Sequence, residues 1–258
     1  MSSILFIKEN NIAIIKLNRP DKFNSFNREM ALSMQEALND AKNDSVIRAI
    51  YISGEGKAFC AGQDLAEAID PNGPGIKKIV EEHYNPIIKL IRAIEKPVVC
   101  AVNGVAAGAG ANIALACDVT VASKSASFIQ AFSKIGLIPD SGGTFFLPRL
   151  IGLGKASALM MMGDKVGAEE ASQMGMIYKF FEDDQLQQEA IKIAQTLATM
   201  PTVGLGLTKR LLNSSLSSSL ESQLKNEADL QEMAGKSEDH KEGVNAFLEK
   251  RKPEFKGK

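Results

Sequence analysis

Short apolar runs and amphipathic stretches alternate through the first two thirds of the chain. The runs from Ile4 to Lys8 and from Ile12 to Leu17 are rich in β-branched residues, and the three polar residues between them predict a β-hairpin. A strand is expected from Ile47 to Ser53, because glycines follow that apolar run. A helix is expected from about Arg28, where apolar residues repeat at helical spacing, at Met30, Met34, Ala37, Leu38 and Ala41.

The alternation continues after a polar, Gly- and Pro-containing segment from Asp70 to Gly75, which we expect to be a loop. A helix is expected from Ile76 to Ile94. Short apolar strands are expected at Pro97 to Val102, Val119 to Ala122 and Ala126 to Ile129. Because strand, strand and helix recur in this order, the pattern predicts an α/β fold.

Beyond about Leu186 the pattern is helical only, with a break at Pro201 and a long polar helix from about Leu220. Such a segment is too polar to form a core of its own. We therefore predict that residues 1–195 form the core and carry the site. Residues 196–258 are predicted to be a helical C-terminal region that makes subunit contacts and closes over a ligand.

Charge and hydropathy exclude several classes of partner. The chain has 258 residues, with 30 basic and 31 acidic ones, so no strong field is present to hold a nucleic acid or an anionic membrane. The chain contains no run of about 20 apolar residues, the length needed to span a bilayer. The first ten residues, MSSILFIKEN, do not resemble a signal peptide. These features predict a cytoplasmic protein.

The cysteines and histidines predict no metal site. Cys60, Cys100 and Cys117 lie in runs of apolar or small residues and do not have the close spacing of metal ligands. We expect them to be buried free thiols in a reducing compartment. The chain has only two histidines, which also argues against a histidine-based metal site.

Two glycine-containing segments could present main-chain amides to a ligand. In AFCAGQDL, Gly62 permits a backbone shape that other residues resist, although this segment taken alone favours an ordinary strand-to-helix connection in which Asp64 caps the helix. In NGVAAGAGAN, a helix beginning around Ala109 would direct free N–H groups toward an oxyanion, or could simply be tightly packed. Together the two segments suggest a pair of amides that stabilises a thioester oxygen.

One carboxylate stands out in a third segment, GLIPDSGGT. Asp140 has apolar and glycine neighbours, so burial should raise its pKa toward a range useful for proton transfer. The alternative is that Asp140 caps a helix from Gly143 to Leu150. Four phenylalanines nearby could form an acyl pocket or belong to the core, namely Phe128, Phe132, Phe145 and Phe146.

These segments, in this order, resemble the enoyl-CoA hydratase/isomerase (crotonase) family. The resemblance covers NRPDKFNSF, AFCAGQDL, AVNGVAAGAGANIALACD, GLIPDSGGTFFLPRLIG and AFLEKR. It implies a crotonase-like spiral of ββα turns with a C-terminal helical region, assembled as a homotrimer or homohexamer. It also implies an acyl-CoA thioester as substrate. Coenzyme A would enter as part of that substrate, with no other cofactor.

The resemblance also assigns site residues. The backbone N–H groups of Gln63 and Ala109 would form the oxyanion hole, and Asp140 would be the catalytic aspartate. Phe247 and Lys250 would contact the ligand of a neighbouring subunit. The substrate-binding residues would be Arg19, Lys22, Ala61, Gly62, Asp64, Gly108, Phe132, Phe247 and Lys250.

This sequence departs from the hydratases of the family at two positions. Where they carry the two glutamates that activate water, it has Asn112 and Phe132, which cannot act as bases. We therefore expect an isomerase that uses Asp140 alone, and further motifs such as FSKIGLIPDSGGT resemble a branch that isomerises ring-epoxidised acyl-CoA. The alternatives are a hydratase, dehalogenase or thioester hydrolase of the same family, or a non-catalytic acyl-CoA-binding protein.

Overall fold

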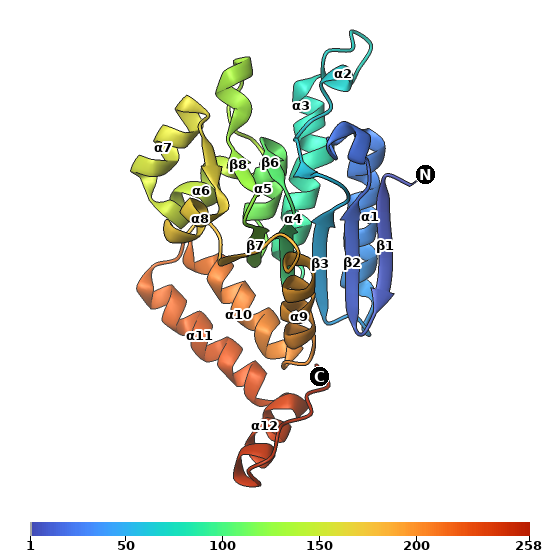
Figure 1. Ribbon diagram of the computed structural model, residues 1–258. Coiled ribbons are helices and arrows are strands. Elements are labelled where there is room, and N and C mark those ends of the chain that lie inside the picture. The colour runs from blue at the N-terminus through green and yellow to red at the C-terminus, as the bar shows by residue number, and fades with distance from the viewer. Residues whose placement is uncertain (1) are drawn as a thin grey trace.

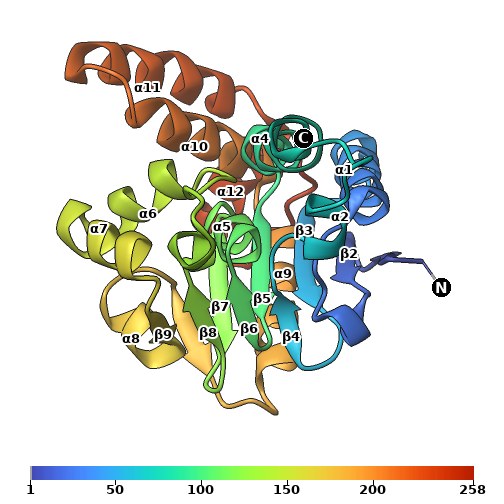
Figure 2. The same ribbon diagram turned by 90° about the horizontal axis from the view of Figure 1, so that it is seen from above.

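Three consecutive strand–strand turns organise the first two thirds of the molecule. The computed structural model describes residues 2–258. In each turn the first strand enters a six-stranded sheet of order β1-β2-β3-β5-β7-β10, and the second enters a four-stranded sheet of order β4-β6-β8-β9 (Figures 1 and 2). The three pairs are β3 (Ala49–Gly54) with β4 (Ala58–Cys60), β5 (Val98–Val102) with β6 (Val105–Ala107), and β7 (Val119–Ser123) with β8 (Ser127–Ile129).

The predicted N-terminal hairpin is confirmed. Strands β1 (Ile4–Glu9) and β2 (Ile12–Leu17) pair in antiparallel register, and β2 then pairs in parallel with β3. The turn consists of Asn10 and Asn11, both with positive φ, which asparagine tolerates better than most residues. The hairpin thereby supplies the outer edge of the large sheet.

Both faces of the large sheet are covered, as expected for strands that are apolar on both sides. Ile15, Ile50 and Ile52 belong to a core cluster on one face, which also includes residues of α1 (Arg28–Asn43). Ile14 and Tyr51 belong to a cluster on the other face, where α9 (Leu186–Ala198) lies across the strands (Figure 1). Alternation of side chains along each strand divides the two clusters.

The predicted helix from Ile76 to Ile94 has an interruption. It consists of α3 (Ile76–Ile79), a π-helical turn (Val80–Tyr84) and α4 (Asn85–Ala93). A π-turn inserts one extra residue per turn, so the faces of α3 and α4 are out of phase with a continuous helix. Sequence periodicity alone did not reveal this change.

Several three-residue strands were also not predicted, because runs this short carry little pattern. They are β4 and β6, within the glycine-containing segments, and β9 (Lys165–Gly167) and β10 (Lys179–Phe181) at the edges of the two sheets. The helices between them are α2 (Leu65–Ala68), α5 (Ala109–Leu115), α6 (Gly143–Ile151), α7 (Leu153–Met162) and α8 (Ala168–Gln173).

Three helices complete the chain, α10 (Thr202–Ser215), α11 (Leu220–Gly235) and α12 (Glu238–Leu248), and they extend away from the sheets (Figure 1). The predicted boundary after residue 195 falls inside α9, which packs on the large sheet. The division of the chain into two units stays a prediction. None of the helices in residues 2–258 is both long enough and apolar enough to cross a bilayer.

Candidate functional site

A cavity of about 470 Å³ lies beside the loop after β4, the start of α5 and the loop before α6. Every predicted site residue lines it except Arg19, Phe247 and Lys250. Those that line it are Lys22, Ala61, Gly62, Gln63, Asp64, Gly108, Ala109, Phe132 and Asp140. Residues from four separate parts of the sequence therefore meet around one space.

The Gln63 amide is left free by its neighbours. The Gly62 carbonyl accepts from Phe26 N–H at 2.7 Å, and Asp64 N–H donates to the Phe26 carbonyl at 2.8 Å. Because main-chain groups alternate in direction along an extended segment, the N–H of Gln63 points away from Phe26. Neither this N–H nor that of Ala109 has a hydrogen-bond partner anywhere in residues 2–258.

The two free amides lie close together. Ala109 is the first residue of α5, whose opening N–H groups have no partner within the helix. Gly62 has φ +92°, and a Cβ added to it would lie 3.0 Å from the Ala107 carbonyl oxygen and 3.6 Å from the Ala109 nitrogen. Glycine thus allows the β4 loop to approach the start of α5, so both amides can be offered to one acceptor.

Asp140 lines the same cavity and does not cap a helix. The N-cap of α6 is Gly142, without a side-chain hydrogen bond, so the capping interpretation of Asp140 is wrong. Burial raises the pKa of the Asp140 carboxyl, and a hydrogen bond donated by the Ser141 hydroxyl at 2.8 Å opposes that shift. The result is a carboxylate that binds a proton more readily than an exposed aspartate.

The main chain of Asp140 is held by Asn112, which sequence analysis treated only as the replacement of a glutamate. The Asn112 side chain donates to the Asp140 carbonyl oxygen at 2.8 Å, and Gln130 donates to the Asn112 side-chain oxygen at 2.8 Å. Phe132 is buried, with its ring against Gly108. Position 112 therefore holds an amide that supports Asp140, and position 132 holds a phenyl ring in the cavity lining; neither can act as a base.

Asp64 and Arg19 are engaged with each other. Asp64 accepts from Ala66 N–H at 3.2 Å as the N-cap of α2, so the capping interpretation of Asp64 is confirmed. Its other oxygen pairs with Arg19 at 2.9 Å, and Arg19 also donates to the Ser25 carbonyl. Contact of Arg19 with coenzyme A stays a prediction. Lys22 does line the cavity, together with Lys134, which sequence analysis did not identify.

Phe132 is the only one of the four candidate phenylalanines found in the cavity lining. Phe128 belongs to the main core. Phe145 and Phe146 pack edge to face, with ring centroids 5.1 Å apart, and Arg149 lies over Phe145. The apolar wall instead comes from aliphatic residues that sequence analysis did not select, namely Ile76, Ile79, Val80, Ile135 and Leu137.

The Gln63 side chain is fixed at both ends. The Tyr84 hydroxyl donates to its carbonyl oxygen at 2.8 Å, and its NH₂ group donates to the Glu67 carboxylate at 2.8 Å. Tyr84 is buried and lines the cavity. No group of three or more His, Cys, Asp or Glu that could hold a metal is found within residues 2–258, and the three cysteines are buried and free as predicted.

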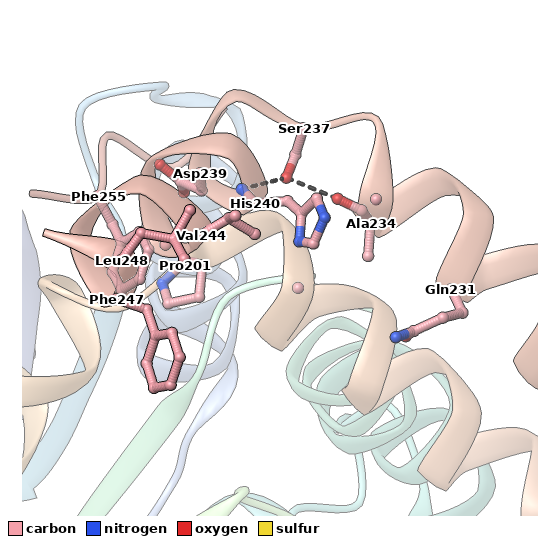
Figure 3. A pocket seen from close by; sticks show the side chains of 13 residues that line it. Pro201, Gln231, Ala234, Ser237, Asp239, His240, Val244, Phe247, Leu248 and Phe255 are labelled. Atoms are coloured by element: carbon pink, nitrogen blue, oxygen red, sulfur yellow. Dashed lines mark hydrogen bonds between the residues drawn. The ribbon is translucent and has the colours of Figure 1, made fainter. Parts of the chain in front are cut away.

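Phe247 and Lys250 lie elsewhere, at the end of the C-terminal helices. Phe247 is 82% exposed and lines a separate groove of about 440 Å³ between α11, α12 and the chain end (Figure 3). In that view its ring points away from the labelled residues. Contact of either residue with a neighbouring subunit's ligand stays a prediction.

Comparison with known proteins gives consistent results over the whole chain. The family model for enoyl-CoA hydratase/isomerase matches residues 7–258. A 1,2-epoxyphenylacetyl-CoA isomerase of Escherichia coli (strain K12) is 47% identical over 100% of both chains. A crotonyl-CoA hydratase of Syntrophomonas wolfei is 34% identical over 98% of this chain and 97% of its own.

A solved structure shows the same fold. The crystal structure of an enoyl-CoA hydratase from Bacillus anthracis superimposes with a TM-score of 0.92 at 31% identity, over 99% of this chain and 100% of the other. The predicted spiral of ββα turns with C-terminal helices is confirmed by this likeness.

Proposed function

This chain belongs to the enoyl-CoA hydratase/isomerase family, and within it we propose an acyl-CoA isomerase that shifts a proton or a double bond through a thioester enolate. The proposed substrates are 1,2-epoxyphenylacetyl-CoA or a Δ3-enoyl-CoA. The first is supported by the 47% identity to the isomerase of that name, although other relatives of this chain are hydratases.

The observation that carries the proposal is the single unpaired carboxylate in the cavity lining. Within residues 2–258 the cavity is lined by two aspartates, and Asp64 is already paired with Arg19. Among the described residues Asp140 has no cationic partner, and burial raises its pKa. One base can move a proton between two carbons, whereas hydration by the two-glutamate route needs a second carboxylate.

The proposed mechanism uses the free amides and the carboxylate together. The thioester oxygen accepts hydrogen bonds from the N–H groups of Gln63 and Ala109, while ionised Asp140 removes a proton from the acyl chain. The amides stabilise the negative charge that develops on the oxygen, and one such donor contributes roughly 3 kcal/mol. Protonated Asp140 then returns the proton two carbons away. With an epoxide, the same proton removal begins ring opening.

The test is turnover of an acyl-CoA panel by the Asp140→Asn variant. We expect it to bind acyl-CoA but to lose isomerisation of a 3-enoyl-CoA, along with solvent deuterium incorporation at the α and γ carbons. Asp164→Asn, at an exposed aspartate, is the matched control and should leave turnover unchanged. Isomerisation retained by Asp140→Asn would overturn the proposal. If the wild type hydrates crotonyl-CoA in preference to isomerising a 3-enoyl-CoA, the protein is a hydratase. If the wild type binds acyl-CoA without turnover, the protein is a non-catalytic acyl-CoA-binding protein.

We propose that no metal or redox cofactor takes part, because proton transfer by a carboxylate requires neither. Coenzyme A enters with the substrate. Activity should therefore persist in the presence of a chelator. We also propose a cytoplasmic location, since three buried free thiols are typical of a reducing compartment.

We propose a homotrimer or homohexamer assembled through the C-terminal helices. Helix α11 buries none of its 16 residues within the single chain. The groove in Figure 3 is lined by apolar residues that include Val244, Phe247 and Leu248, all exposed. A neighbouring subunit would cover them and bring Phe247 and Lys250 near its own ligand. Sedimentation of the full chain as a monomer at micromolar concentration would contradict this assembly.

A further inference from the structure

The two hydrogen bonds of the Gln63 side chain act on the same residue whose main-chain amide faces the cavity. The carboxamide oxygen accepts from Tyr84 and its nitrogen donates to Glu67. Glu67 is itself held by the N–H of Arg28, at the start of α1, at 2.9 Å. Gln63 is thus linked to the turn that contains Tyr84 and, through Glu67, to the start of α1, although it lies in a connecting segment after a three-residue strand.

The π-turn brings Tyr84 into this position. In the turn Val80–Tyr84, adjacent residues His83 and Tyr84 are both buried, at 0% and 1% exposure. The Tyr84 ring also packs against Phe26, with centroids 5.9 Å apart, and Phe26 forms the main-chain bridge to Gln63. Single π-turns occur often at functional sites. Here the turn directs one hydroxyl at the end of a residue that borders the cavity.

We propose that Tyr84 is a positioning residue that keeps the main-chain amide of Gln63 directed at the thioester oxygen. The Gly62–Gln63 peptide group, which carries the free N–H, is held on its other side by the hydrogen bond from Phe26 N–H to the Gly62 carbonyl. The fixed carboxamide of Gln63 adds a second point of attachment, which keeps this peptide group from tilting about that hydrogen bond. This inference rests on the proposed function, because it assigns a support to the oxyanion hole proposed there.

Other features of Tyr84 agree with a donor that acts through Gln63. Burial raises the pKa of Tyr84, with the Asp140 carboxylate among the smaller contributions, so the hydroxyl stays protonated and can donate throughout the working pH range. The hydroxyl already donates its proton to the side-chain oxygen of Gln63, so it cannot give that proton to the acyl chain without breaking this hydrogen bond. Positioning is therefore the role that the geometry supports.

A tyrosine that is only part of the core would behave differently. Tyr84→Phe keeps the ring and its packing against Phe26 but removes the donor to Gln63. A purely structural role predicts lower stability with unchanged catalysis. A positioning role predicts a fall in kcat of about tenfold with little change in KM, because misplacement of one donor removes part of its contribution to the transition state.

The decisive measurement compares binding of hexanoyl-CoA with binding of S-hexyl-CoA, which has CH₂ in place of the carbonyl. The wild type should prefer the thioester by roughly three- to tenfold, through hydrogen bonds to its oxygen. Tyr84→Phe should lose most of this preference while binding S-hexyl-CoA as before. Tyr51→Phe, at a buried tyrosine on the opposite face of the large sheet, should keep it.

The outcomes separate the two proposals. If the wild type does not distinguish the two ligands, the oxyanion hole of the proposed function fails. If the wild type distinguishes them and Tyr84→Phe does so equally well with unchanged kcat, only the role of Tyr84 is overturned. Glu67→Leu removes the acceptor at the other end of the Gln63 carboxamide. It provides a second variant, with the same expected loss, should Tyr84→Phe not fold.

Discussion

Removal of the buried cation of α10 should loosen the attachment of this helix to the core. The Lys209 ammonium group, on a residue only 6% exposed, donates to Asp118 at 2.6 Å and to the Ile91 carbonyl at 2.7 Å. It also reaches the Lys96 carbonyl at 3.3 Å. Lys209→Met preserves most of the side-chain length and apolar stem but removes all three hydrogen bonds.

The expected cost follows from what remains paired. Breaking a buried ion pair by removing one partner costs about 3–5 kcal/mol, chiefly because the other charge is left alone. Asp118 keeps hydrogen bonds from Arg92 at 2.9 Å and from Val98 N–H at 2.8 Å, so its negative charge still has two donors. Two carbonyls also lose a donor. We therefore expect a loss near the lower end, about 3 kcal/mol of the free energy of unfolding.

The next residue along the helix provides a matched control. Arg210 pairs with Glu95, but both side chains are 48% exposed, and a pair of this kind contributes at most about 1 kcal/mol. Urea denaturation at neutral pH would measure both variants, and hydrogen exchange would show whether the amides of α10 lose protection first in Lys209→Met. If Lys209→Met costs no more than Arg210→Met, the buried contact does not attach α10, and the reasoning fails.

Three further predictions concern the site. Burial raises the pKa of Asp140 above the ordinary 3.8, so kcat/KM should fall with acid at a pH above that value, and a pH profile with its acid limb at or below 3.8 would contradict the proposed base. Because burial makes the pKa of Asp140 higher in the folded than in the unfolded protein, the ionised carboxylate destabilises the folded state above that pKa. Asp140→Asn should therefore raise the urea midpoint at pH 7 and leave it unchanged near pH 3. A Cβ on Gly110 would lie 2.4 Å from the Cys60 carbonyl oxygen, so Gly110→Ala should cost about 1–3 kcal/mol in denaturation and reduce turnover, whereas Gly154→Ala, with open space around it, should do neither.

Sequence patterns predicted the long elements because their signals are local. The hairpin was expected at nearly its observed bounds and α1 at its observed start, since alternation and helical spacing extend over many residues there. Strands β4 and β6 were missed because three residues cannot display a period. The π-turn was missed because both flanking segments read as helix, and only packing against the core shows the change of phase.

The main-chain part of the site was accessible to sequence reasoning, whereas its side-chain supports were not. Gly62 and the small residues before α5 indicated two approaching backbones, and the structure brings Gln63, Ala109 and Asp140 to one cavity. Nothing in the sequence links Gln63 to Tyr84, 21 residues away, because that contact depends on the π-turn. Aromatic composition likewise could not identify which side chains form the wall, since burial in the core and exposure to a cavity favour the same residue types.

Asn112 has a consequence for any attempt to change the reaction. Its NH₂ group is the side-chain donor that secures the main chain of Asp140, and a Cβ added to Gly143 would lie only 2.4 Å from its nitrogen, so little room is available there. A glutamate at position 112 would supply a base for water, but it would also remove that donor and place an acceptor opposite the Asp140 carbonyl. A carboxylate added at position 112 to activate water would therefore remove the hydrogen bond that supports Asp140, the base of the proposed isomerisation.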